Sequence, residues 1–211
     1  MNIYKWFLLF IIYSFIGWIA EIVCQLLNNK KYVNRGFLIG PYCPIYGFGS
    51  ILMIILLQRY LNNPVLLFFM AVLICSLLEY FTSYIMEKLF KARWWDYSEK
   101  KFNLNGRISL DTMILFGLGG VIVLYFVNPF ILGILNSWPS TVIKLLSVLI
   151  FIIYLLDTII SSKIIISFRN TTKKEARDNT DELTRKVKET LLKKSKLSRR
   201  LVKSFPNLKI K

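Results

Sequence analysis

Four acidic side chains are the strongest candidates for functional chemistry in this sequence, because each lies inside or at the edge of a long apolar stretch: Glu21, Glu79, Asp111 and Asp157. An ionised carboxylate near the centre of a bilayer costs about 3 kcal/mol on insertion scales, so such groups pair internally or line a polar path. Carboxyl groups in such a path bind cations or carry protons. We therefore predict that the four acids, together with Gln25, mark a substrate or ion pathway.

Glu21 and Glu79 each belong to a line of polar residues on one side of a predicted helix. Lipid cannot satisfy polar groups, so these lines should face other helices or a wet cavity. The alternative is that both carboxyls only join helices, held by neighbours such as Gln25, Tyr80 or Trp18. The lines have the spacing of a helix face: Ser14, Gly17, Glu21, Gln25 and Asn28 in the first stretch, and Ser76, Glu79, Ser83 and Glu87 in the third.

Asp111 and Asp157 differ in their local surroundings. Asp111 follows Arg107 at the i, i+4 spacing that permits an ion pair on one helix. Asp157 has no basic residue within one turn, although Lys163 lies nearer the end of the stretch. The partner of Asp157 must therefore come from another part of the chain, or its carboxyl takes up a proton.

The chain has the composition of a membrane protein. Of its 211 residues, 55% are hydrophobic, and the mean hydropathy is +0.51. A helix needs about 20 apolar residues to cross a hydrocarbon core of about 30 Å. We predict an all-α, polytopic integral membrane protein with five transmembrane helices, the first of which is not a cleaved signal. They cover residues 5–27, 43–61, 65–86, 108–128 and 141–166.

The positions of Lys and Arg predict the orientation of these spans. Basic residues gather after the first predicted span, between the third and fourth, and after the fifth. Cytoplasmic connections carry such an excess, so the N-terminus should lie outside and the C-terminus in the cytoplasm. At 1.5 Å per residue, all four acids then lie within about 15 Å of the cytoplasmic boundary. We predict that they line one acidic cavity in the inner half of the membrane.

We divide the chain into a transmembrane domain, residues 1–166, and a basic cytoplasmic tail, residues 167–211. The net charge is +16, and most of the excess lies in the tail. Asn179 and Glu182 have the spacing of a helix cap, which predicts a basic amphipathic C-terminal helix. This helix could bind anionic lipid or a partner, or its charges could only enforce the topology. We expect the lipid bilayer as a partner and no nucleic acid, because the basic residues flank apolar stretches.

Several residue types that catalysis requires are absent or poorly spaced. The chain has no histidine, and its three cysteines, Cys24, Cys43 and Cys75, include no C-x-x-C pair. Serine–histidine and cysteine–histidine catalysis are therefore excluded, and we expect no metal, no cofactor and no enzymatic activity. No P-loop motif is present, so the chain does not hydrolyse ATP by that route.

The segment GPYCPIYGFG, between the first and second predicted spans, has two prolines that forbid a continuous helix. Non-helical backbone at membrane depth is tolerated where it is buried or lines a cavity, and it often marks a binding site in transporters. We predict a re-entrant or binding loop; the alternative is an ordinary proline-marked start of the second span. The residues concerned are Gly40, Pro41, Pro44, Tyr46 and Gly47.

The connection RWWDYSEKKFNLNGRISL is dense in aromatic and charged residues. Trp and Tyr suit the headgroup layer, and its Asn-Gly pair is a turn signal. We predict that the connection contacts a cytoplasmic partner; an interfacial anchor without a further role is the alternative. The predicted contact residues are Arg93, Trp94, Trp95, Asp96, Tyr97, Asn103 and Gly106.

Four motifs occur in one order: YSFIGWIAE, GPYCPIYGFG, LEYFTSYIME and RWWDYSEKKFNLNGRISL. In this set the chain resembles the ABC-transporter type IV family, the CmpB-like bacterial membrane proteins, over about residues 1–165. The resemblance implies a permease-like subunit of the bacterial inner or plasma membrane that works with a separate ATPase. The basic tail lies largely outside it.

These observations favour a permease-like protein, expected as a homo-oligomer, whose polar lines meet around Glu21, Glu79 and Asp157. As a transporter it would take a cationic or polar substrate, or couple to protons. The alternative is a non-transporting sensor or scaffold that recruits partners or anionic lipid through its basic tail. A lipid-modifying enzyme that uses the carboxyls as acid and base ranks last, because histidine and metal-ligand clusters are absent from the sequence.

Overall fold

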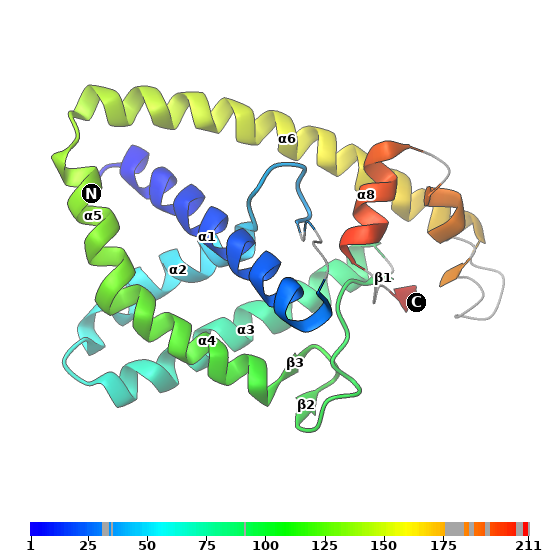
Figure 1. Ribbon diagram of the computed structural model, residues 1–211, viewed down its shortest axis with the longest axis horizontal. Helices are drawn as coiled ribbons and strands as arrows, with labels where there is room; N and C mark the ends of the chain where they lie inside the picture. Colours follow the sequence, from blue (N-terminus) through cyan, green and yellow to red (C-terminus); the bar gives the residue numbers. More distant parts are fainter. Residues whose placement is uncertain are drawn as a thin grey trace.

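The computed structural model describes residues 1–30, 34, 36–90, 92–175, 184–185, 188–192, 195–205 and 209–210. The fold is nearly all-α, and the long helices run lengthwise beside one another (Figure 1). In chain order the elements are α1 (Ile3–Asn29), α2 (Pro44–Leu57), η1 (Gln58–Tyr60), α3 (Pro64–Phe90), β1 (Ala92–Arg93), β2 (Asn103–Leu104), β3 (Ile108–Ser109), α4 (Leu110–Ile122), η2 (Val123–Val127), α5 (Asn128–Ser137), α6 (Ser140–Glu175), α8 (Lys196–Ser204) and β4 (Lys209–Ile210).

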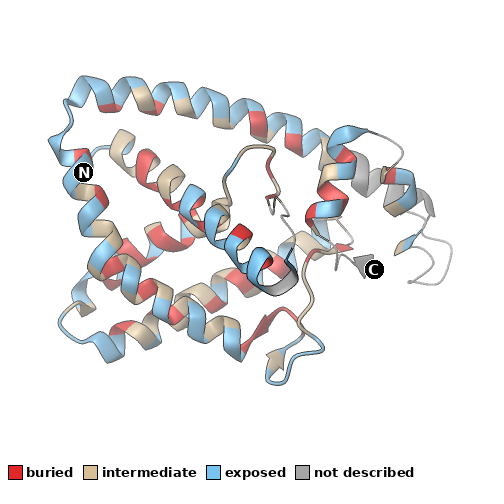
Figure 2. Ribbon diagram, in the orientation of Figure 1, coloured by how far each residue is buried: buried red, intermediate tan, exposed pale blue. Residues whose placement is uncertain are grey.

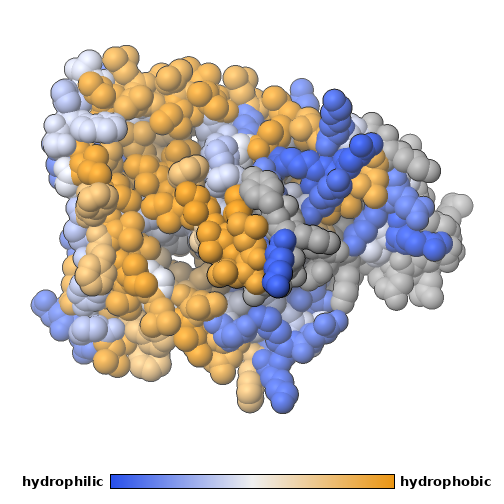
Figure 3. Space-filling view, viewed as in Figure 1, coloured by the Kyte–Doolittle hydropathy of each residue, from blue (hydrophilic) through white to orange (hydrophobic). Residues whose placement is uncertain are grey.

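Four helical stretches among the described residues are long and apolar enough to cross a membrane: Ile3–Leu27, Pro64–Phe90, Leu110–Ser137 and Ser140–Ile164. Many of their apolar side chains are exposed, and α6 is exposed along most of its length (Figure 2). Figure 3 shows this apolar surface over the helices and hydrophilic residues at the end that carries the β2–β3 connection and α8. Apolar surface of this extent is suited to lipid. The chain is a multi-pass membrane protein.

The prediction of five spans is not confirmed, because the second predicted span is short. Helix α2 has 14 residues and therefore rises about 21 Å, against a hydrocarbon core of about 30 Å. It begins at Pro44, whose missing N–H suits the first turn of a helix. The stretch predicted as span two thus consists of a short helix and the 3-10 turn η1, preceded by the non-helical segment 36–43.

The fourth predicted span, 108–128, continues past its predicted end to Ser137. Pro129 lacks an N–H group, yet the helix does not stop there. One π-turn, η2, precedes it, and the Asn128 N–H bonds to the Val123 carbonyl. A π-turn of this kind absorbs a break in the hydrogen-bond ladder without ending the helix. The connection from α5 to α6 is consequently only Trp138 and Pro139.

The connections lie at two opposite ends of the helix bundle (Figure 1). One end carries the N-terminus, η1 and the α5–α6 turn; the other carries the β2–β3 connection and α8. Helix α1 packs most extensively against α2, and α3 against α4. The main core joins α1, α2, α3, η2, α5 and α6, and its buried residues are Leu8, Leu9, Tyr13, Met53, Ile54, Leu57, Leu67, Ala71, Leu124, Ile131, Leu135 and Ile143.

The described part of the tail packs onto the second end of the bundle. Helix α6 continues past residue 166 to Glu175, and β4 pairs with β1 in antiparallel register. Helix α8 buries Leu201 and Val202 in a second apolar cluster, which also holds Trp94 and Phe37. The helix start predicted at residues 179–182 lies outside the described residues.

Candidate functional site

Asp157 of α6 holds the non-helical segment 36–43 against that helix. Its carboxylate accepts hydrogen bonds from the backbone N–H groups of Ile39 (3.0 Å) and Gly40 (2.7 Å) and from the hydroxyl of Tyr42 (2.7 Å). Ser161, one turn later on α6, donates a further bond at 2.8 Å. As expected, most partners of Asp157 come from another part of the chain. They are neutral donors that together solvate one carboxylate.

The segment 36–43 reaches deep along the neighbouring helices. Asp157 lies about 10 Å before Ile164, where the apolar stretch of α6 ends. Cys43, the last residue before α2, donates its N–H to the Ser14 carbonyl near the middle of α1 at 2.9 Å. Non-helical backbone at such depth needs partners from its neighbours, because lipid offers none. Asp157 and Ser14 supply them.

Helix α8 of the basic tail also holds this segment, through Arg200. Arg200 donates hydrogen bonds to the carbonyls of Gly36 (2.7 Å) and Leu38. Burial lowers the pKa of the Arg200 guanidinium, and the negative charge of Asp157 opposes this shift. Arginine nevertheless stays charged, because its ordinary pKa is far above neutral pH. The segment is therefore bound at its N–H groups by Asp157 and at its carbonyls by Arg200.

Glu21 of α1 is bonded to Tyr46 of α2. The Tyr46 hydroxyl donates to Glu21 Oε1 at 2.6 Å. The aromatic ring lies directly over Gly17, one turn earlier on α1, where an added Cβ would be 2.2 Å from the ring. Gly17 thus leaves the space through which the tyrosine reaches the carboxyl. Gln25, one turn after Glu21, is buried on the same helix.

Gly47 brings the backbones of α1 and α2 into close contact beside this pair. An added Cβ at Gly47 would lie 2.3 Å from Ser14 Oγ and 2.6 Å from the Phe10 carbonyl oxygen. The serine side chain could rotate, but the carbonyl belongs to the helix ladder and cannot move alone. Only glycine fits here without separating the two helices.

We expect Gly47→Ala to lower the free energy of unfolding by about 1 to 3 kcal/mol, the usual cost of overpacking. The measurement is SDS-induced unfolding in mixed micelles. Gly119→Ala is the matched control, because Gly119 is also helical and a Cβ there meets nothing within 4 Å. Equal stability of the two variants would contradict the close approach of α1 and α2.

Glu79 of α3 is buried, with 6% of its surface exposed. The Tyr97 hydroxyl, from the connection after α3, donates to Glu79 Oε1 at 3.2 Å. Glu79 Oε2 has no hydrogen-bond partner among the described residues, and neither has Ser76 Oγ one turn earlier. A buried carboxylate oxygen without a donor is unusual in a folded protein. This oxygen is the most conspicuous unsatisfied group of the candidate pathway.

The two glutamates and their tyrosines form one group. Glu21 lies within electrostatic reach of the Glu79 carboxyl, and Tyr97 within reach of Tyr46. We refer to Glu21, Tyr46, Glu79 and Tyr97 as the carboxyl–tyrosine cluster. It joins α1, α2, α3 and the connection after α3, whereas Asp157 joins α6 to the segment 36–43.

Asp111, at the start of α4, has a different partner from the one expected. It pairs with Lys100 of the preceding connection, not with Arg107. The i, i+4 argument assumed one helix, but residues 108–109 form the extended strand β3 and α4 begins only at Leu110. Asp111 is also more than half exposed. It therefore lies at the edge of the structure, close to the carboxyl–tyrosine cluster but not buried within it.

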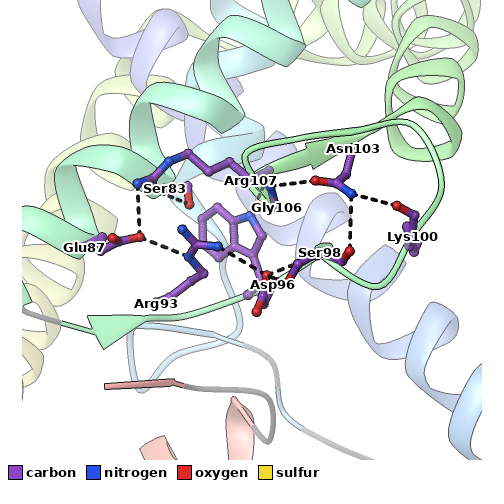
Figure 4. A network of polar contacts seen from close by, with 10 residues as sticks. Ser83, Glu87, Arg93, Asp96, Ser98, Lys100, Asn103, Gly106 and Arg107 are labelled. Atoms are coloured by element: carbon purple, nitrogen blue, oxygen red, sulfur yellow. Dashed lines mark hydrogen bonds and ion pairs between the residues drawn. The ribbon is translucent and has the colours of Figure 1, made fainter. Parts of the chain in front are cut away.

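Glu87, at the end of α3, organises the connection between α3 and α4 (Figure 4). Its carboxylate pairs with Arg93 Nε at 3.0 Å and Arg107 Nη2 at 3.1 Å. Arg93 also pairs with Asp96 at 3.3 Å. Gly106 has a φ of 66°, and an added Cβ would lie 2.7 Å from Asp96 Oδ1. The turn at Gly106 thus packs directly on the ion-pair network.

Most residues predicted to contact a partner have contacts within the protein. Trp94 lies in the second apolar cluster, and Trp95 donates to the Arg107 carbonyl at 3.1 Å. The Asn103 side chain bonds to the Lys100 carbonyl at 2.7 Å and accepts from the Gly106 N–H at 2.8 Å. The aromatic and polar side chains of this connection therefore hold the connection itself in its folded conformation.

The surface that the connection offers is its tip, residues 98–105. Phe102 is 80% exposed and Leu104 55%. Phe102 has a positive φ of 56°, and its carbonyl accepts from the Leu110 N–H at 3.1 Å. The exposed phenylalanine is thus presented by an ordered turn.

The predicted site residues did not include four residues that the structure brings into these contacts: Tyr42, Glu87, Arg107 and Arg200. Glu87 had a signal, since it ends a predicted polar line and Arg93 follows close after it in sequence. Tyr42 lies within the glycine- and proline-rich segment that was singled out. Arg200 had none, because it is one of many basic residues in the tail.

The chain matches the model of the family described as "Putative ABC-transporter type IV" over residues 8–162. The matched range includes the carboxyl–tyrosine cluster, the α3–α4 connection and Asp157, and it ends before α8. No curated protein and no solved structure matches the chain.

Proposed function

The chain belongs to the family described as "Putative ABC-transporter type IV", and on this premise we propose that it is the permease-like membrane subunit of an ATP-driven transporter. The sequence contains no P-loop, so ATP hydrolysis falls to a separate ATPase subunit. The chain then supplies the path through the membrane and catalyses no reaction itself.

The observation that carries this proposal is the non-helical segment 36–43 beside α1 and α6. It is tied to Asp157 within the apolar length of α6 and to Ser14 near the middle of α1. Broken backbone at this depth is a feature of transporter binding sites, where freed backbone groups line the path. The buried carboxyl of Glu79 adds a second polar group within the helix bundle. We therefore propose a path that runs past Asp157 and the carboxyl–tyrosine cluster.

We propose that the end with the β2–β3 connection and α8 faces the cytoplasm of a bacterial cell, with the N-terminus outside. The support is the excess of Lys and Arg in the connections and tail at this end. In this orientation the exposed tip, residues 98–105, faces the compartment where ATP is found. We propose that Phe102 at this tip contacts the ATPase, and that the complex contains more than one copy of the chain.

The proposal predicts a protein crosslink from the tip. A photo-crosslinking phenylalanine analogue in place of Phe102 should capture, in native membranes, a protein that contains a P-loop. The analogue at Phe126 is the matched control, because that side chain is also exposed (70%) but lies on η2 within an apolar helix. Mass spectrometry identifies the captured protein. Absence of a P-loop protein from position 102, or equal capture from both positions, would count against the ATPase contact.

The alternative function is a membrane scaffold that recruits partners or anionic lipid through the tail. One observation favours it: α8 buries Leu201 and Val202 but leaves Lys196, Arg199 and Lys203 exposed as a cationic face. Such a face suits anionic headgroups or an acidic partner. A scaffold of this kind needs no ATPase, so the crosslink from position 102 separates the two functions.

A further inference from the structure

Helix α8 rests on the ends of two membrane spans. Its buried side chains Leu201 and Val202 belong to the second apolar cluster, against which Phe90 and Ile164 pack. Phe90 ends the apolar stretch of α3, and Ile164 ends that of α6. The hydrocarbon core of a bilayer ends where such apolar stretches end. Helix α8 therefore lies at the depth of the lipid headgroups, beside the far end of α6 (Figure 1).

The cationic face of α8 lies on the side of this helix that the protein leaves uncovered. Lys196, Arg199 and Lys203 recur at intervals of three and four residues, which places them on one face, and all three are exposed. Arg199 Nε donates to the Leu192 carbonyl at 3.1 Å. Within the described part of the chain, none of the three forms an ion pair. Their positive charges at headgroup depth attract anionic lipid.

Other side chains of α8 hold the chain that leads into α2. Arg200 donates to the carbonyls of Gly36 and Leu38. The Ser204 hydroxyl donates to the Asn34 carbonyl at 2.6 Å. Because these contacts use no residue of the cationic face, α8 holds this chain and presents its positive charges at the same time. A ligand that binds the cationic face in this docked position stabilises the docked state, and with it the contacts to the chain before α2.

We propose that the cationic face of α8 binds the phosphate groups of anionic lipids in the surrounding membrane, and that this binding locks the segment 36–43 in place. Lysine and arginine form charge-assisted hydrogen bonds with phosphate oxygens. The depth of α8 favours lipid over an acidic protein, because headgroups already surround the ends of the spans on which α8 rests. The inference goes beyond the proposed transport function and does not depend on it, since the contacts of α8 are the same in a scaffold.

The test measures hydrogen–deuterium exchange of the segment 36–43 by mass spectrometry. The full-length protein is placed in nanodiscs of phosphatidylcholine, with or without phosphatidylglycerol. The anionic lipid should slow exchange by at least about fivefold, the factor that one basic residue near an anionic membrane contributes. The difference should largely disappear in Lys196→Gln with Lys203→Gln. It should persist in Arg59→Gln with Lys144→Gln, the matched control, which removes two exposed basic residues at the opposite end of the bundle.

Arg200→Gln separates lipid binding from its effect on the segment. This variant keeps the cationic face, so native mass spectrometry should find as much bound phosphatidylglycerol as on the wild type, but the exchange difference in residues 36–43 should be lost. Circular dichroism establishes that the variants are folded, and the lysine pair, at exposed positions, tests the proposal without Arg200.

Three results would overturn the proposal. They are exchange that is equal or faster with phosphatidylglycerol, loss of the effect in the control pair, and the same slowing by inorganic phosphate in nanodiscs of phosphatidylcholine alone. Because the protein is purified, an absence of any lipid effect would assign the cationic face to an acidic protein instead.

Discussion

Asp157→Ala is expected to lower the free energy of unfolding by about 3 to 5 kcal/mol. The change removes an acceptor that serves the backbone N–H groups of Ile39 and Gly40 together with the Tyr42 hydroxyl. Each buried donor that loses its partner costs about 1 to 3 kcal/mol. In lipid the cost is not relieved by water, because the segment lies within the apolar length of α6. SDS titration in mixed micelles measures the effect.

Asp157→Asn provides the graded control for this prediction. Asparagine retains one acceptor oxygen of nearly the same shape but turns an NH₂ group toward donors. We expect roughly half the loss of the alanine variant. Asp111→Ala, at an exposed carboxyl, should change stability by no more than about 0.5 kcal/mol. If Asp157→Ala were as stable as Asp111→Ala, the segment 36–43 would not depend on this carboxylate.

Glu87→Ala is expected to cost about 3 to 5 kcal/mol, since it removes one partner from a buried ion-pair network. The side chains of Arg93 and Arg107 are only 11% and 9% exposed, and both pair with this one carboxylate. Arg93 keeps Asp96 as a partner. Among the described residues, Arg107 keeps the Ser83 hydroxyl, at 3.3 Å, and the ring faces of Tyr80 and Tyr84. The buried charge of Arg107 is therefore left without a carboxylate partner. The measurement is the same unfolding titration.

A double substitution shows whether the loss arises from the stranded charge. Glu87→Met with Arg107→Met replaces the pair by apolar groups of similar length, which is often close to neutral in stability. We expect the double variant to recover most of what Glu87→Ala loses. Glu99→Ala, an exposed carboxyl in the same connection, serves as the control and should remain within about 0.5 kcal/mol. A double variant no better than Glu87→Ala would mean that packing, and not charge, explains the loss.

The helices were more predictable than the contacts between them. Apolar stretches of about 20 residues identified the four long spans, because the cost of exposing backbone in lipid forces each stretch into a helix. The same argument overestimated the length of the second helix, because average hydropathy does not show where the backbone leaves the helical conformation. The prolines did reveal it: Pro41 and Pro44 indicated broken backbone before α2, as the structure has it.

The partners of the acids were the weakest part of the prediction. Trp18 and Tyr80 were considered for Glu21 and Glu79, but Trp18 donates to Asn34 and Tyr80 accepts from Asn105. The glutamates instead bind tyrosines from other elements. Helical spacing predicts neighbours on one helix only. It cannot identify a tyrosine that approaches from an adjacent helix.

The sequence by itself determined the membrane class, the basic end of the bundle, the broken backbone around Pro41 and the burial of carboxyls within apolar helices. Each follows from a local balance between apolar surface, charge and backbone hydrogen bonds. The tertiary structure alone decided that Asp157 binds the segment 36–43, that Arg200 holds its carbonyls, and that Glu79 keeps an unsatisfied oxygen. These contacts join residues that are far apart in the chain, so they depend on how whole helices pack. No local pattern of residues records that packing.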